Sequence, residues 1–142
     1  MKMKILMKKF DLDELYWGDW KELLENSNKL EELFVYIEDY DSRSIEELSQ
    51  ILKLYSNPSG VFTIEFADIV AELYKSDKIK FMKALNLVQD EAINLVYIFR
   101  NLQIFSDGDE ELKEVLSKGN LSQNEIDTAS IFYQMYKNIC SS

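Results

Sequence analysis

The stretch DEAINLVYIFRNLQ, residues 90–103, is the part of the sequence that indicates the fold most clearly. Its apolar residues recur at spacings of three and four, which is the pattern of an α-helix. We predict that this helix buries Ala92, Ile93, Val96 and Phe99. Its remaining apolar residues make it hydrophobic on nearly every side. A helix of that kind is usually covered on two faces, so we expect it to be the central element of an all-α domain.

Similar helical patterns continue on both sides of this stretch. An N-cap residue followed three residues later by Glu marks the start of a helix, because the two side chains can satisfy each other's free backbone N–H groups. Such pairs are Asp11 with Glu14, Asn28 with Glu31, Ser44 with Glu47, Asp107 with Glu110, and Ser122 with Glu125. Asp77 precedes one further helical pattern, and the run SNPSG at 56–60 interrupts the series with the only proline. About eight short helices are therefore predicted.

Residues 61–66 also alternate in the manner of a β-strand, but we favour a helix here. Short helices joined by short connections favour antiparallel neighbours. The predicted fold is therefore all-α, with the helices stacked as antiparallel hairpins. Two arrangements fit that description, a compact irregular bundle and a HEAT-like α–α superhelix. No internal repeat of fixed period is present.

The chain has 142 residues and a formal net charge of −10, which is typical of one acidic globular domain spanning 1–142. Only its first ten residues are basic, because they contain Lys2, Lys4, Lys8 and Lys9. We expect this short segment to pair with the acidic body of the protein or to stay mobile. The rest of the surface would repel a phosphate backbone, so no direct binding of nucleic acid is expected.

Several kinds of chemistry lack their residues in this sequence. It contains no histidine and a single cysteine, Cys140, which excludes Ser-His-Asp and Cys-His catalysis and zinc sites that need histidine or several cysteines of one chain. The carboxylate pairs Glu65 with Asp68 and Asp90 with Glu91 could supply an acid and a base, but acidic side chains on helices are mostly solvated. We expect a non-enzymatic protein that has no cofactor and no metal site.

The composition also suggests where the protein works. The sequence contains no run of 18 apolar residues, and one cysteine fits a reducing compartment, so we expect a cytoplasmic protein that does not enter a membrane. Lysine is far commoner than arginine, and Ile, Asn, Tyr and Phe are plentiful, which suggests a bacterial or phage origin.

One surface of the predicted helices combines negative charge with exposed apolar residues. In the helix that follows Asn28, the buried stripe places an acidic face with an apolar centre on the opposite side. The acidic residues continue across the next turn into the following helix. The predicted partner-binding residues are Glu31, Glu32, Val35, Tyr36, Glu38, Asp39, Asp41, Glu46 and Glu47. Negative charge would steer a basic protein to this face, and the apolar residues would anchor it.

These features favour a stoichiometric protein inhibitor of the toxin-immunity or phage anti-host type. Its partner would be a basic protein, such as a nuclease-type toxin or a host protein that binds nucleic acid, because such proteins hold phosphate with positive charge. A scaffold or adaptor subunit that self-associates through apolar surface is the first alternative, and a homo-oligomer would then form. An enzyme that uses only carboxylates is the second.

Overall fold

The computed structural model describes Tyr16, Trp20, Glu25, residues 27–39, 43–58, Gly60 and residues 62–141. Seven α-helices and two short 3₁₀ helices lie in this part of the chain. In chain order they are α4 (Ser27–Glu38), α5 (Ile45–Lys53), η1 (Leu54–Ser56), α6 (Thr63–Ser76), α7 (Lys78–Leu87), η2 (Gln89–Glu91), α8 (Ala92–Leu102), α9 (Gly108–Ser117) and α10 (Gln123–Ser141). The all-α prediction is confirmed. The predicted helix that follows Asp11 and the basic segment 1–10 lie outside the described residues.

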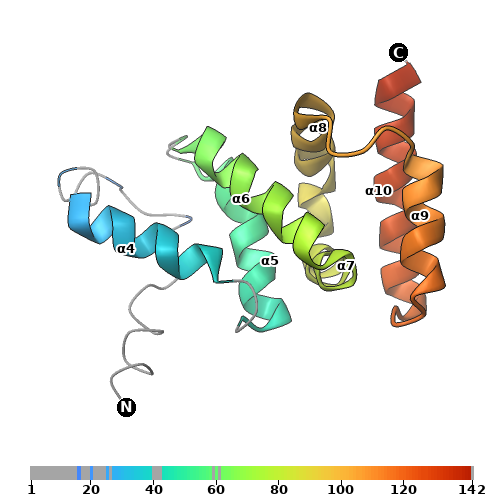
Figure 1. Cartoon of the computed structure of the whole chain (residues 1–142), viewed down its shortest axis with the longest axis horizontal. Coiled ribbons are helices and arrows are strands. Elements are labelled where there is room, and N and C mark those ends of the chain that lie inside the picture. The colour runs from blue at the N-terminus through green and yellow to red at the C-terminus, as the bar shows by residue number, and fades with distance from the viewer. Residues whose placement is uncertain are drawn as a thin grey trace.

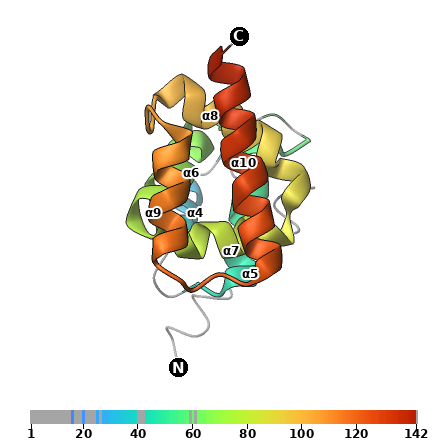
Figure 2. The same cartoon turned by 90° about the vertical axis from the view of Figure 1, so that its right-hand side faces the viewer.

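The helices succeed one another along the long axis of the molecule, from α4 at one end to α9 and α10 at the other (Figure 1). The most extensive contacts join α5 with α7, α7 with α10, α8 with α10, and α9 with α10. Helices α9 and α10 lie side by side and antiparallel in both views (Figures 1 and 2), as expected of a helical hairpin. Within the described residues, no helix has both the length and the apolar character needed to span a membrane.

Two of the predicted capping pairs close as full capping boxes. The Oγ atom of Ser44 accepts a hydrogen bond from the Glu47 backbone N–H at 3.1 Å, and the Glu47 carboxylate accepts one from the Ser44 N–H at 3.2 Å. Ser122 and Glu125 make the same two bonds at 3.3 and 2.8 Å. These local bonds satisfy N–H groups that have no partner within the helix, which is why α5 and α10 begin where the sequence predicts.

Two further predicted starts, those of α7 and α9, follow the same logic, and that of α4 differs. Asp77 caps α7 by accepting from the Lys80 N–H at 3.0 Å, and Asp107 caps α9 by accepting from the Asp109 N–H at 2.9 Å. Helix α4, however, already includes Ser27, so Asn28 lies inside its first turn rather than at its N-cap.

The proline-containing interruption forms a compact turn. Asn57 donates from its side chain to the Leu54 carbonyl at 2.8 Å, and Gly60 adopts φ +67°, a conformation that glycine tolerates without steric cost. Helix α6 then begins at Thr63, and Phe62 lies just before it with φ +56°. Residues 63–66 are therefore helical and not a strand.

Helix α8 lies between α6 and α10, and it corrects one residue of the predicted buried stripe, Ile93. Ala92, Val96 and Phe99 are buried as predicted, but Ile93 is 41% exposed and Tyr97, one turn further on, is 52% exposed. Helices α6 and α10 pack against α8, and these two side chains lie on the face that they leave uncovered. An apolar residue on a helix surface is common in folded proteins, so the hydrophobic pattern overestimated the buried width of this helix.

The core contains two groups of aromatic side chains at opposite ends of the stack. The C-terminal aromatic cluster joins α6 to α10 and the loop before α9 through Tyr74, Phe81, Phe99, Phe105, Phe132, Tyr133 and Tyr136. The N-terminal aromatic cluster consists of Trp20, Phe34, Phe62 and Phe66. Edge-to-face contacts dominate both groups, which is the arrangement that the quadrupoles of aromatic rings favour.

Candidate protein-binding groove

An open groove of about 530 Å³ lies between α4 and α6. Its two apolar lining residues are Phe34, which is half-buried, and Ile69, which is buried. The other lining residues are all acidic: Glu38 from α4, and Glu65, Asp68 and Glu72 from α6. We call this feature the α4/α6 groove. It combines an apolar floor with carboxylates on both walls.

The sequence builds the two walls by ordinary helical amphipathicity. Helix α4 buries Leu33 and Ile37, while Phe34 and Glu38, one turn apart, face the groove. Helix α6 buries Phe66, Val70 and Leu73 on one side, and its three acidic residues recur on the other at one-turn spacing.

The N-terminal aromatic cluster supports the floor of the groove. The Phe34 ring lies 5.5 Å from the Phe62 ring and 5.8 Å from the Phe66 ring, and Trp20 packs against both of those rings at 5.7 and 5.8 Å. Bulky rings therefore fill the space beneath α4 and α6, so that the floor is formed by side chains that tertiary packing holds in place.

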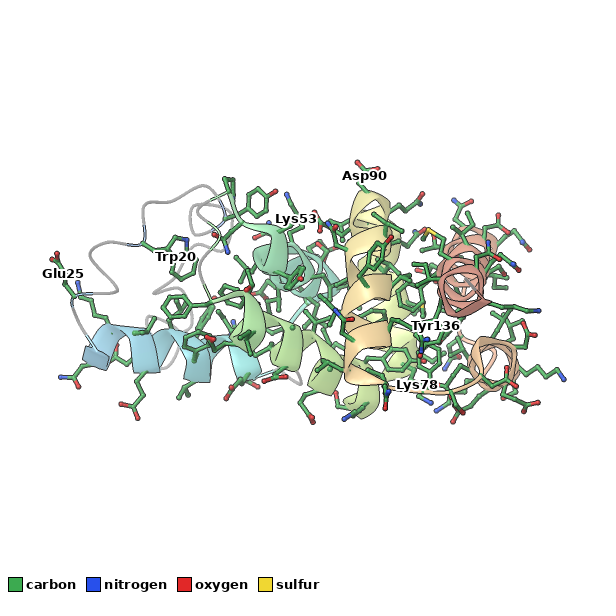
Figure 3. All side chains as sticks on the ribbon, turned by 90° about the horizontal axis from the view of Figure 1, so that it is seen from above. Trp20, Glu25, Lys53, Lys78, Asp90 and Tyr136 are labelled. Carbon is green, nitrogen blue, oxygen red and sulfur yellow. The ribbon has the colours of Figure 1, made fainter. Side chains whose placement is uncertain are left out.

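The groove carboxylates have few hydrogen bonds or ion pairs with other side chains of the described residues. Glu38, Glu65, Asp68 and Glu72 are all exposed. Among the described residues, no side-chain hydrogen bond or ion pair engages Glu38, Glu65 or Asp68, and Glu72 makes only an exposed ion pair with Lys75 at 3.7 Å. Oxygen-tipped side chains project outward from α4 and α6 (Figure 3). The groove therefore presents a local negative potential to solvent.

Two apolar side chains flank this negative surface. Ile64 on α6 is 74% exposed and Val35 on α4 is 66% exposed, the largest values for any large hydrophobic residue in the described part of the chain. Ile64 precedes Glu65 and lies one turn before Asp68, and Val35 follows Phe34. Hydrophobic side chains with that exposure provide contact area that a partner can bury.

The structure divides the predicted acidic face into parts. Glu38 lines the groove. Glu31 and Val35 are exposed on the adjacent part of α4, Glu32 is exposed further round the helix, and Asp39 is exposed just after its end. Glu46 is exposed on α5, and Asp41 lies outside the described residues.

Tyr36 and Glu47, the two remaining predicted residues, contact a buried arginine. The Arg43 side chain is buried, with its guanidinium carbon 3.6 Å from the centre of the Tyr36 ring. Its Nη2 donates to the Tyr36 carbonyl at 2.6 Å and its Nη1 donates to the Glu47 carboxylate at 3.2 Å. These contacts fix the connection between α4 and α5, so both residues have an internal role in addition to any external one.

Part of the groove was not among the predicted partner-binding residues. The sequence predicts Glu65 and Asp68 only as a possible catalytic pair, and it does not predict Glu72 or Ile64 as binding residues. The available signal was the repetition of Glu65, Asp68 and Glu72 at one-turn spacing, opposite the buried stripe of the same helix. Their position beside Glu38 depends on how α4 packs near α6, which no local pattern reveals.

A second acidic region, at the start of α9, is arranged differently. The Tyr74 hydroxyl donates to Glu111 at 2.7 Å and lies 2.6 Å from the Tyr133 hydroxyl, and Lys78 pairs with Glu111 at 2.9 Å and with Glu114 at 2.5 Å. We call these five residues the C-terminal polar network. Burial raises the pKa of both the Tyr74 and the Tyr133 phenol. The network links α6, α7, α9 and α10, so we interpret its carboxylates as stabilising the fold.

The described residues offer no ready site for a metal, because no three acidic or cysteine side chains among them are grouped suitably. Comparison of the chain with protein-family models, with curated proteins and with solved structures finds no significant match.

Proposed function

We propose that this chain is a non-catalytic protein-binding module, and that its α4/α6 groove docks a basic surface of another protein. One observation carries the proposal: four carboxylates surround an apolar floor, and three of them have no side-chain partner among the described residues. A cationic partner would supply the missing counter-charges, and Phe34, Val35 and Ile64 would supply apolar contact.

The most concrete form of this proposal is a stoichiometric inhibitor of the toxin-immunity or phage anti-host type. Such a protein covers a basic active-site or nucleic-acid-binding surface of its target. An acidic groove is suited to that task, because a surface that holds phosphate is positively charged and attracts the groove carboxylates at long range.

The test compares three forms of the tagged chain as bait in lysate of the source cell. The first is the unaltered chain. The groove variant carries Glu65→Gln, Asp68→Asn and Glu72→Gln. The remote variant carries the matched changes Asp90→Asn, Glu110→Gln and Asp127→Asn on exposed residues of η2, α9 and α10, with Asp90 on the side of the molecule opposite α4 and α6 (Figure 3).

The proposal predicts that the unaltered chain and the remote variant retain the same basic protein in stoichiometric amount, and that the groove variant does not. Retention should fall as the Debye length decreases from about 10 Å at 0.1 M salt to about 3 Å at 1 M. Equal retention of the basic protein by the groove variant, or the absence of any basic protein, would contradict the proposal.

A scaffold function remains the second candidate, and one observation favours it. Ile93 and Tyr97 form an exposed apolar ridge on α8, which could contact a second copy of the chain. The discriminating result is a salt-resistant oligomer of the purified protein that Ile93→Ser with Tyr97→Ser dissociates, since apolar association depends weakly on ionic strength.

A further inference from the structure

The spacing of the groove carboxylates indicates the kind of structural element that the groove accepts. Glu65, Asp68 and Glu72 lie on one face of α6, three and then four residues apart. At 1.5 Å rise per residue, this row extends about 10.5 Å along the helix, with about one helical turn between neighbours. The row therefore has the repeat of an α-helix.

A basic helix laid along α6 would match this repeat. Lysine or arginine residues at i, i+3 or i+4, and i+7 lie on one face of a helix with the same axial spacing of about one turn, so three cations could meet three carboxylates in register. A partner strand would not match, since its same-face residues recur about every 6.7 Å and three of them extend about 13 Å.

The opposite wall and the floor add to this match. Glu38 extends the negative potential to the α4 side, so a cation on the flank of the bound helix would also find a carboxylate. Phe34 and Ile69 form the floor between the two walls, and Val35 and Ile64 are exposed beside it. An apolar residue on the basic face of the partner helix would therefore find apolar contacts in the same groove.

We propose that the occupant of the α4/α6 groove is an amphipathic α-helix of the partner protein, with basic residues at one-turn spacing and an apolar residue on the same face. This inference rests on the proposed function, because it specifies which element of a basic partner docks. It corresponds to helix-in-groove recognition, in which side chains at i, i+3, i+4 and i+7 make the contacts.

Two fluorescent peptides of identical composition test the inference. Each is an alanine-rich helix of about 20 residues, long enough to be helical in isolation. The in-register peptide has lysines at i, i+3 and i+7 and leucine at i+4. The scattered peptide has lysines at i, i+5 and i+6, about 0°, 140° and 240° around the helix axis, so that no two of its charges share a face. Circular dichroism establishes equal helicity, and fluorescence anisotropy at low salt measures the binding of each peptide to the full chain.

We expect the in-register peptide to bind about tenfold more tightly than the scattered one. The groove variant should abolish this preference, and the remote variant should keep it. Equal affinity of the two peptides, or a preference that survives in the groove variant, would overturn the helical occupant while leaving the capture of a basic protein from lysate unaffected. Failure of that capture, by contrast, would overturn the proposed function itself, so the two failures are distinguishable.

Discussion

The two acidic regions of this protein both lie on helices, but the fold uses their carboxylates differently. At the start of α9, Glu111 accepts a bond from Tyr74 and pairs with Lys78, and Asp109 pairs with Lys137 at 3.1 Å. In the α4/α6 groove, Glu65 and Asp68 have no such partner among the described residues. An acidic run is therefore a candidate binding surface only where the fold leaves its charges without internal compensation.

The largest difference in stability should appear when one aromatic side chain is truncated to alanine at each end of the molecule. Phe99 is fully buried and contacts Tyr74, Phe81 and Phe132 in the C-terminal aromatic cluster. Phe99→Ala should lower the free energy of unfolding by about 3–5 kcal/mol, because it removes apolar contact and leaves a cavity. Phe34→Ala should cost clearly less, since Phe34 is half-buried at the groove. Urea unfolding of both variants measures the difference, and equal losses would show that the groove is as integral to the core as the far end.

The second-largest effect should be a loss of folding stability at alkaline pH, caused by the C-terminal polar network. Burial raises the pKa of the Tyr74 and Tyr133 phenols above the ordinary value of about 10. The folded state then keeps protons that the unfolded state releases. The stabilisation is therefore fully present below pH 10, and stability falls as the pH rises above it, by up to about 1.4 kcal/mol per pH unit for each phenol.

Two measurements check this prediction. Ultraviolet titration should show fewer phenolates than the eight tyrosines of the chain until the protein unfolds. Urea unfolding at increasing pH should show a steeper loss of stability in the unaltered chain than in the double variant Tyr74→Phe with Tyr133→Phe. Complete titration of all tyrosines in the folded protein would contradict the buried network.

Removing single hydroxyls should give a smaller and unequal effect. Tyr74→Phe leaves the buried Tyr133 hydroxyl without its partner and removes one donor from Glu111. It should cost about 1–3 kcal/mol. Tyr133→Phe leaves the Tyr74–Glu111 bond intact, so it should cost about 0.5–1.5 kcal/mol. Thermal or urea unfolding compares the two variants. A larger loss of stability for Tyr133→Phe would contradict the prediction that the Tyr74 hydroxyl contributes more than the Tyr133 hydroxyl.

The smallest effect on stability should come from the groove. The groove variant removes three exposed charges, only one of which has an ion pair, so its free energy of unfolding should stay within about 0.5 kcal/mol of the unaltered chain. The same kind of change in the network, Glu111→Gln, should cost more, because Glu111 accepts from Tyr74 and pairs with Lys78. A strongly destabilised groove variant would mean that these carboxylates have a structural role.

Local chemistry explains which parts of the fold were predictable. Ser44, Asp77, Asp107 and Ser122 were identified as helix starts because each bonds within three residues along the chain. Burial along α8 was only partly predicted, since apolar pattern alone does not say which side neighbouring helices cover, and Ile93 lies on the uncovered side.

The candidate site was less predictable, because it arises from tertiary packing. Glu38 was predicted from its place on the outer face of α4, but its proximity to Glu65 and Asp68 depends on how α4 packs beside α6. The contacts of Arg43 with Tyr36 and Glu47 likewise need the chain to turn back between two helices. Helical periodicity gives the face of a residue, whereas tertiary packing determines which faces meet.

The affinity of the captured basic protein for the groove and remote variants tests the central claim most directly. Both variants lose the same formal charge. Titration calorimetry at about 0.1 M salt therefore distinguishes binding at the groove from attraction by the net charge of the whole chain. We predict a loss of affinity of about tenfold or more for the groove variant and less than about twofold for the remote variant. Equal losses in the two variants would show that net charge alone attracts the partner, and would contradict a binding site between α4 and α6.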